Sequence, residues 1–381
     1  MPEHETDYPE YESDERENET GEHDAYETDE LEPETEERLP DGVPYMEPEE
    51  EPEEEPEPEA EAELEAEADF DAETELDAET ELEPETVTVT ATATAPAPGP
   101  RPKYSAEISR DNPSFFLFLV DQSSSMADDF RAGDATQPKA SGVADGINRW
   151  MQELSIKCAK AEGVRDYYHV GVIGYGNTVS PAFVGTIAGR DLVPISEIAE
   201  NPARLEQRTK KVPDGAGGII EQTVRVPVWL DPVANGATPM CRAASEAYRI
   251  LEEWLDEHPD CFPPIVIHIT DGEATDGMPL ERIRALTNMQ STDGNVLLFN
   301  IHLSGHADAD PISFPDSPDV LPDDYSKMLY ETASSLTPMM AALAREHGFK
   351  VTDQSKAFVL NADLVLLVQA IDIGTRPSNL R

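Results

Sequence analysis

The sequence predicts an α/β domain with a doubly wound, mostly parallel sheet and helices on both faces. Apolar runs of strand length, such as Phe115–Val120 and Ile265–Thr270, lack the alternation of a half-exposed strand and indicate strands buried on both faces. Segments with apolar residues at steps of three and four, such as Lys139–Lys160, lie between these runs and indicate helices. From about residue 112 the two patterns alternate, which is the order expected of a parallel α/β sheet.

The first hundred residues belong to a different physical class. Residues 1–100 hold 41 acidic side chains and two basic ones, a net charge of −39 out of −53 for the whole chain. Such a segment cannot bury enough apolar surface to offset the entropy lost on ordering, and its charges repel one another. We therefore expect a disordered, Glu-rich acidic tail over residues 1–86 and a Thr/Ala/Pro linker over residues 87–112.

The globular domain is expected over residues 113–374. Strands are predicted where apolar runs occur, at Phe115–Val120, Tyr167–Tyr175, Ile265–Thr270, Val296–Leu303 and Ala357–Leu360, with a short edge strand at Thr178–Phe183. Helices are predicted by periodicity at Lys139–Lys160, Thr238–Glu257, Pro279–Met289, within Tyr325–His347, and at Ala362–Ile373. Thr238 is expected to cap its helix, with Pro239 at the first helical position.

Two parts of this domain lack a clear periodicity. Residues 185–232 contain several glycines and prolines and are expected to form an irregular insertion. A second, Pro-rich insertion is expected near residues 304–324, and residues 375–381 are expected to form a C-terminal extension.

Oxygen-bearing side chains occur where two predicted strands end. Asp121, Ser123 and Ser125 alternate directly after the first strand, so a tight loop can turn all three side chains toward one point. Asp271 ends a later strand, and Thr238 lies in a turn that opens a helical pattern. Open α/β sheets bind ligands at the carboxyl ends of their strands. Hard oxygen donors of this kind suit magnesium or manganese better than zinc or copper.

This pattern resembles the metal-ion-dependent adhesion site of the von Willebrand factor A (VWA) family, which reads D-x-S-x-S, then a distant Thr, then a distant Asp. The matching positions here are Asp121, Ser123, Ser125, Thr238 and Asp271. The phrases LVDQSSSM, NGATPM and ITDGEATDG are similar to those of intracellular bacterial members, including members encoded beside tellurite-resistance genes. The resemblance implies a Rossmann-like fold, usually of six strands with one antiparallel edge.

The chain departs from the family pattern at one position of this motif. Many members have glycine between the two serines, where this chain has Ser124. If that position requires a positive φ, a serine there is strained.

The resemblance also implies a ligand and a role. A Mg²⁺ (or Mn²⁺) ion would be held directly by the two serines, and directly or through water by Thr238 and the two aspartates. Because only two of the five donors are anionic, the ion would stay electrophilic and take a carboxylate from a partner protein at an open position. This describes a metal-dependent protein-interaction module. Related intracellular members act beside AAA+ ATPases or kinase and phosphatase partners, so a cytoplasmic adaptor in a bacterial stress-response or regulatory complex is expected.

Candidate residues for the rim of this site are Tyr175, Asn177 and Glu273, which lie near predicted strand ends. The tail is a further candidate ligand, because its glutamates are the type of donor that the metal would lack. About 60 flexible residues span roughly 40–45 Å, which is long enough to reach the metal-bearing face. Occupancy of the site by the chain's own tail is therefore a second hypothesis.

Enzymatic alternatives have weaker support. A strand that ends in Asp also opens the haloacid-dehalogenase phosphatases, but Ser123 replaces the second acid of their D-x-D motif. The sequence has no phosphate-binding loop, H-E-x-x-H or G-x-S-x-G motif, and His268 and His302 lie inside apolar runs, as core histidines do. We expect no enzymatic activity and keep a metal-dependent phosphohydrolase as the alternative.

The remaining features concern compartment and partners. The acidic N-terminus does not resemble a secretory signal, and no apolar stretch is long enough to span a membrane. The three cysteines form no C-x-x-C motif, so neither a disulfide framework nor a zinc site is indicated. The strong negative charge argues against nucleic acid or an anionic membrane as partner.

Overall fold

The computed structural model describes residues 102–132, 135–213, 219–303 and 310–375. The predicted tail, the linker up to residue 101 and the C-terminal extension after Thr375 lie outside the described residues. Residues 304–309 of the second predicted insertion also lie outside them.

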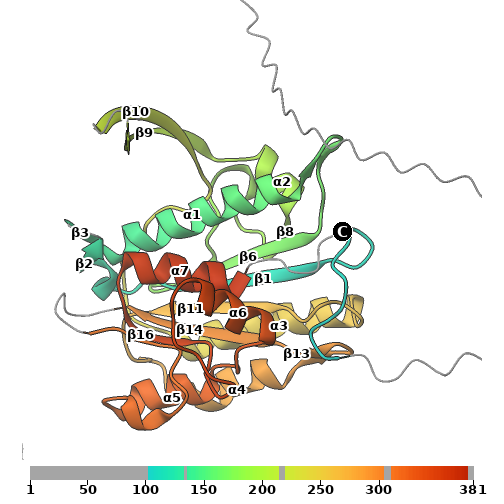
Figure 1. Ribbon diagram of the computed structural model, residues 1–381, viewed down its shortest axis with the longest axis vertical. Coiled ribbons are helices and arrows are strands. Elements are labelled where there is room, and N and C mark those ends of the chain that lie inside the picture. The colour runs from blue at the N-terminus through green and yellow to red at the C-terminus, as the bar shows by residue number, and fades with distance from the viewer. Residues whose placement is uncertain (1–101, 133–134, 214–218, 304–309, 376–381) are drawn as a thin grey trace, which may run out of the picture. The chain divides into compact units, whose positions relative to one another are not determined.

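A mostly parallel sheet forms the centre of the domain, with strand order β15-β16-β14-β11-β1-β6-β7 and β8 paired to β6 (Figure 1). Five strands run parallel: β1 (Ser114–Asp121), β6 (Tyr168–Tyr175), β11 (Ile265–Thr270), β14 (Leu297–Leu303) and β16 (Phe358–Ala362). Three short strands at the margins are antiparallel: β7 (Val179–Pro181), β8 (Val193–Pro194) and β15 (Ile312–Ser313). The predicted fold class is confirmed. The sheet has eight strands rather than the expected six, because these short strands extend it.

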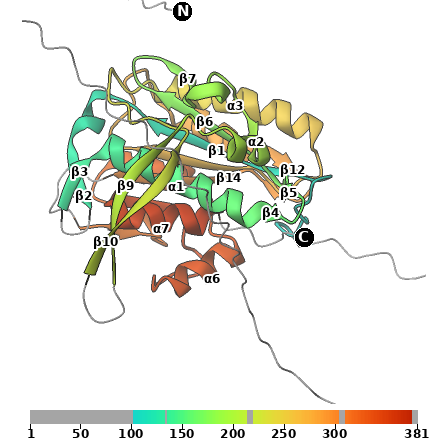
Figure 2. The same ribbon diagram turned by 90° about the horizontal axis from the view of Figure 1, so that it is seen from above.

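Helices cover both faces of the sheet, as Figures 1 and 2 show. One face carries α1 (Lys139–Cys158), α2 (Ile195–Glu200), α6 (Pro338–Glu346) and α7 (Leu364–Thr375). The other carries α3 (Met240–Glu257), α4 (Leu280–Asn288) and α5 (Asp324–Thr332).

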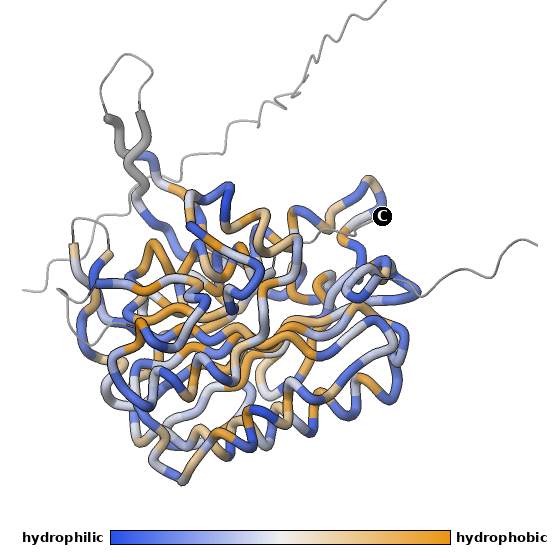
Figure 3. The backbone as a smooth tube through the Cα atoms, turned by 60° about the horizontal axis from the view of Figure 1, so that its bottom comes forward, coloured by the Kyte–Doolittle hydropathy of each residue, from blue (hydrophilic) through white to orange (hydrophobic). Residues whose placement is uncertain are grey.

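The central strand β1 is buried along its whole length. Phe116 and Phe118 pack into the core beneath α1, whereas Phe115 and Leu117 pack into the core beneath α3. Each such side chain contributes about 1.5–3 kcal/mol when fully buried, so the unbroken apolar run fixes this strand between two helical layers. Figure 3 shows the apolar strands gathered at the centre of the domain.

The described part of the segment predicted as an irregular insertion is regular, so the predicted irregularity was wrong. Within residues 185–213 and 219–232 the chain forms a 3-10 turn at Gly185–Ile187, then β8, α2 and a long hairpin of β9 (Arg204–Pro213) and β10 (Ile219–Val228). Asn148 of α1 holds the base of this hairpin, because its Oδ1 accepts from the backbone N–H groups of Trp229 and Leu230 at 2.9 and 3.0 Å.

The start of helix α3 differs from the predicted one. Helix α3 begins at Met240 after an N-cap at Pro239, so Thr238 is not the side-chain cap that the sequence suggested. The cap comes from Asp276, whose carboxylate accepts from the N–H groups of Cys241 and Arg242 at 2.9 and 3.0 Å. These two bonds join the start of α3 to the loop that follows β11.

Short elements complete the described chain. The hairpins are β2 (Asp129–Ala132) with β3 (Ala135–Pro138), β4 (Ala159–Lys160) with β5 (Gly163–Val164), and β12 (Gln290–Ser291) with β13 (Gly294–Asn295). The 3-10 turns at Ser124–Ala127 and Pro318–Val320 lie in loops. In the part of the chain that the structure describes, no helix has both the length and the apolar character needed to cross a bilayer.

Candidate metal centre

The chain reverses its direction of winding between β1 and β11. The two strands are parallel neighbours, with Val120 paired to Ile269. Beyond β1 the chain continues to α1 on one face, and beyond β11 it continues to α4 on the other. The carboxyl edge between such strands is the topological switch point where open α/β sheets bind ligands. Asp121 ends β1 and Asp271 directly follows β11, so both carboxylates lie at this point.

Hydrogen bonds join four of the predicted ligands into one cluster. Ser123 and Ser125 share a bond between their Oγ atoms at 3.1 Å, and Ser125 Oγ donates to Asp271 Oδ1 at 2.8 Å. Asp121 Oδ1 accepts from the Ser123 N–H at 2.9 Å, and its Oδ2 accepts from Thr270 Oγ1 at 2.8 Å. Asp121 and Ser123 are buried, whereas Ser125 is exposed, so the cluster runs from the core to the surface.

The fifth predicted ligand, Thr238, is placed by its backbone. Its N–H donates to Thr275 Oγ1 at 3.0 Å, and its carbonyl accepts from the Thr275 N–H at 2.9 Å. Just before it, the Asn235 N–H donates to the Gln122 carbonyl at 2.6 Å. The turn that carries Thr238 is therefore held both by the loop after β1 and by the loop after β11.

Ser124 does not need the backbone conformation that favours glycine. The described non-glycine residues with positive φ are Tyr104, Phe314 and Asn361. The Ser124 hydroxyl instead donates to the Gly236 carbonyl and accepts from the Gly236 N–H, each at 3.1 Å. The departure from the family pattern thus adds two bonds between the loops, without backbone strain.

Lys139 is a member of the cluster that was not predicted from the sequence. Its Nζ lies 2.9 Å from Asp271 Oδ2, and the two side chains are only 2% and 0% exposed. It is the first residue of α1, a position where the helix dipole disfavours cations. That unfavourable position is the one sequence signal that could have pointed to it.

The cluster contains two acidic side chains, Asp121 and Asp271, and one basic side chain, Lys139. Burial raises the pKa of Asp121 to about 6, and the hydrogen bonds from Ser123 and Thr270 lower it again in part. With both carboxylates ionised and Lys139 protonated, the cluster carries a net charge of −1.

The donor set fits a hard divalent cation. The hydroxyls of Ser123 and Ser125 and one oxygen of Asp271 follow one another at 3.1 and 2.8 Å. Asp121 is held to the same loop through the Ser123 N–H, and the Thr238 turn is bonded to the loop after β11. Mg²⁺ and Mn²⁺ prefer such oxygen ligands. Among the described residues, no group of three or more His, Cys, Asp or Glu side chains is arranged around a common metal position.

Of the three residues predicted to lie on the rim of the site, two are at the surface and one is not. Asn177 and Glu273 are exposed near the cluster, but Tyr175 is fully buried and cannot lie on a rim. Its hydroxyl bonds His268 Nε2 at 2.8 Å, and His268 Nδ1 bonds Asn300 Oδ1 at 2.9 Å. The prediction that His268 is a core histidine is confirmed.

His302 of β14 lies at the same end of the sheet as the cluster, since it pairs with Thr270 of β11. Burial lowers the pKa of His302 to about 4, with Asp271 acting in the opposite direction. Its ring packs edge-on against Tyr325, whose hydroxyl donates to the Gly272 carbonyl directly after Asp271. Both residues belong to the surroundings of the cluster, which the apolar run around His302 concealed.

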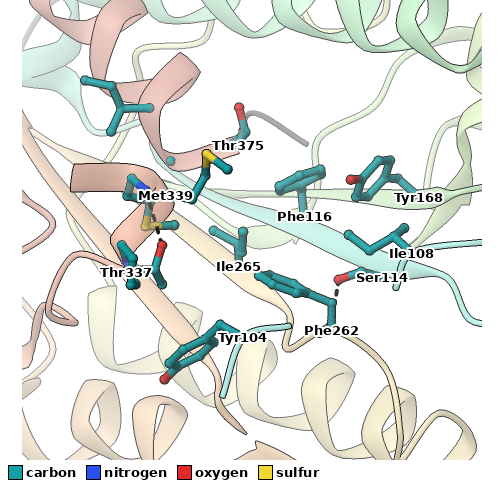
Figure 4. Close-up of a pocket in the computed structure, with 14 residues that line it drawn as sticks. Tyr104, Ile108, Ser114, Phe116, Tyr168, Phe262, Ile265, Thr337, Met339 and Thr375 are labelled. Carbon is teal, nitrogen blue, oxygen red and sulfur yellow. Dashed lines mark hydrogen bonds between the residues drawn. The ribbon is translucent and has the colours of Figure 1, made fainter. Parts of the chain in front are cut away.

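A separate cavity of about 230 Å³ lies at the other end of β1 (Figure 4). Phe116, Tyr168 and Phe262 line it together with Met339, and no carboxylate contributes to its lining. The eight residues of β1 span roughly 25 Å, so this cavity is remote from the oxygen cluster.

Comparison with known proteins adds little. No protein-family model and no curated protein matches the sequence. Solved structures that resemble the chain include the vWF domain, and a three-domain N-terminal fragment, of the type V pili tip protein Mfa5 from Porphyromonas gingivalis. Each is 12% identical over 43% of this chain, with a TM-score of 0.21, and the match covers 39% and 20% of those chains. These values are too low to carry an argument, so the fold class depends on the sheet order itself.

Proposed function

We propose that this chain is a metal-dependent protein-interaction module. A Mg²⁺ (or Mn²⁺) ion would be held by Asp121, Ser123, Ser125, Thr238 and Asp271 and would bind an acidic residue of a partner protein. The observation that carries the proposal is the hydrogen-bonded path from Asp121 through the two serines to Asp271, which brings separate segments of the chain to one edge of the sheet.

Each residue of the cluster has a distinct task in this proposal. Asp121 fixes the loop, because it accepts from the Ser123 N–H and from Thr270 Oγ1 on the neighbouring strand. Ser125 is exposed, so a partner's carboxylate could approach the metal position from its side. The bonds between Ser124 and Gly236 keep the Thr238 turn against this loop. When bound, the metal supplies a Lewis-acidic position that attracts a carboxylate.

We propose binding rather than catalysis. A phosphohydrolase of the D-x-D type needs a second carboxylate two residues after the first, and this position is Ser123. Incubation of the full chain with p-nitrophenyl phosphate and Mg²⁺ tests the alternative. Turnover that disappears in Asp121→Asn would favour the hydrolase.

The partner and the pathway follow only from the resemblance. Intracellular VWA proteins with similar motifs suggest a cytoplasmic adaptor beside an AAA+ ATPase or a kinase and phosphatase system. The proposed metal chemistry implies a narrower class of partner, a protein that presents an Asp or Glu side chain on an accessible surface.

Affinity capture from native lysate tests the proposal directly. The full chain is used as bait with Mg²⁺ and with EDTA, alongside the double variant Ser123→Ala/Ser125→Ala, which removes two hydroxyl ligands without unpairing Lys139. The proposal predicts a prey that is captured only by the unmodified chain with Mg²⁺. Prey that persists in EDTA and with the double variant would contradict metal-dependent binding.

A further inference from the structure

We propose that Lys139 is a built-in cation that occupies Asp271 in the metal-free protein and weakens metal binding by competing for that carboxylate. This inference rests on the proposed function, since it concerns how the same centre takes up its metal. It adds a residue that the adhesion-site pattern does not contain.

Asp271 has no free carboxylate oxygen for a metal ion. Both carboxylate oxygens of Asp271 are already engaged, Oδ1 by the Ser125 hydroxyl at 2.8 Å and Oδ2 by Lys139 Nζ at 2.9 Å. A divalent ion that binds Asp271, directly or through one of its waters, must replace at least one of these donors. The ammonium is the donor that resembles the metal in charge, so it is the competitor.

Lys139 occupies an unusual position for a lysine. Lysine is almost never fully buried unless it is paired, and Lys139 is 1% exposed. It also starts α1, where the helix dipole is unfavourable for a cation, and its N–H donates to the Asp128 carbonyl, which fixes the backbone there. Asp271 is the charged group that offsets both costs.

A second lysine, Lys356, is partly buried and has a different kind of hydrogen-bond partner. Lys356 Nζ donates to the backbone carbonyls of Tyr330 and Glu331 at 3.1 and 2.9 Å and lies over the Tyr330 ring. Its amine thus binds two backbone carbonyls rather than a buried carboxylate. Lys356 therefore provides a matched control for the loss of a lysine.

Lys139 also changes the charge balance of the centre. The two carboxylates and Lys139 sum to −1, so a bound divalent ion brings the centre to +1, whereas without the ammonium it would be neutral. The extra positive charge opposes metal binding but favours the arrival of a carboxylate. Metal and acidic partner should therefore strengthen each other's binding, a coupling that is reciprocal by thermodynamic necessity.

Calorimetric titration of MgCl₂ into the full chain tests the inference. The chain carries a net charge of −53, so its acidic residues also attract Mg²⁺ weakly, and the comparison must be made between variants at about 0.15 M salt. Lys139→Met is expected to bind Mg²⁺ at least tenfold more tightly than the unmodified chain. Lys139→Arg, which keeps the charge, and Lys356→Met are expected to stay within about threefold of it.

The outcomes separate this inference from the proposed function. Saturable binding by the unmodified chain with equal or weaker binding by Lys139→Met overturns the role of Lys139 and leaves the metal centre intact. Binding only in Lys139→Met supports the competition and contradicts metal uptake by the unmodified chain, and with it the proposed function. Absence of site-specific uptake in both proteins overturns the metal centre and the inference together.

A measurement on the unmodified chain avoids any effect of substitution on folding. Acetylation of lysine amines is mapped by mass spectrometry with and without saturating Mg²⁺. Displacement of Lys139 from Asp271 predicts a several-fold rise in its labelling, with Lys356 unchanged. Unchanged labelling of Lys139 while the metal binds would overturn the inference.

Discussion

Two buried polar clusters lie side by side in this sheet and differ in charge. The first joins Tyr175, His268 and Asn300, is neutral, and ends inside the protein, where the Asn300 amide donates to the Leu329 carbonyl at 2.7 Å. The second contains Asp121, Asp271 and Lys139 and reaches the exposed hydroxyl of Ser125.

The difference shows what distinguishes a structural network from a candidate binding site in the same fold. In the neutral cluster the polar groups bond one another, so it fixes the packing of β6, β11 and β14. In the charged cluster a carboxylate is held by a buried ammonium and an exposed hydroxyl. We propose that this cluster exchanges these partners for a ligand, whereas the neutral one has no charged or exposed member to exchange.

The largest expected effect comes from breaking the charged cluster. Asp271→Ala leaves the Lys139 ammonium buried without its partner, and loss of one member of a buried pair costs about 3–5 kcal/mol in the free energy of unfolding. Urea denaturation in EDTA measures this change. The exposed neighbour Glu273→Ala is the control and should change the same quantity by less than about 0.5 kcal/mol.

The same pair allows a double-variant test. Adding Lys139→Met to Asp271→Ala removes the unpaired charge and should recover most of the lost stability. Substitutions of two residues in contact do not have additive effects on the free energy of unfolding. A loss in the double variant equal to the sum of the losses in Asp271→Ala and Lys139→Met alone would show that the pair is not coupled.

The neutral cluster should respond to pH instead. Burial lowers the pKa of His268 to about 4, so in the folded state its ring stays neutral while the unfolded chain takes up a proton below its usual pKa of about 6.5. A lowered folded-state pKa means that stability is retained above pH 6.5 and is lost as the pH falls toward 4. The contribution of this residue over the window is about 3 kcal/mol.

Urea denaturation at several pH values measures this effect through the difference between the unmodified chain and His268→Gln. The raised pKa of Asp121 acts in the opposite direction in both proteins and cancels in the difference. The account predicts a difference curve that changes between pH 6.5 and 4. A flat difference would indicate that His268 is not held neutral by the fold.

The smallest expected effect concerns the contact between the two loops of the charged cluster. Ser124→Ala removes both hydrogen bonds to Gly236 without changing the backbone requirement, at a cost of about 1 kcal/mol. Thermal denaturation of the metal-free chain measures it. A variant as stable as the unmodified chain would mean that these bonds do not hold the loops together.

The sequence predicted the central strands well, because fully buried strands are unbroken apolar runs. The predicted strand Ile265–Thr270 is confirmed to the residue, and Phe115–Val120 differs from β1 by one residue at each end. The β9–β10 hairpin was missed because its described side chains are mostly polar. Its signal was a row of alternating charges, Arg204, Glu206 and Arg208, which pair on one face of the strand.

The candidate site was predictable only where it lies at strand ends. Asp121 and Asp271 follow apolar runs, so their meeting at one edge follows from the parallel sheet. Lys139 is the first residue of α1, and no local sequence pattern connects it with a carboxylate 132 residues away. Asp276 replaced the expected Thr238 cap for the same reason, because a cap supplied by a distant loop leaves no mark at the helix itself.

The central claim is that the oxygen cluster holds one divalent ion, and uptake of Mg²⁺ by the purified full chain tests it most directly. Calorimetry at about 0.15 M salt compares the unmodified chain with Ser123→Ala/Ser125→Ala, whose acidic residues are identical. The account predicts one saturable site in the unmodified chain and its loss in the double variant. Identical titrations for the two proteins would contradict it.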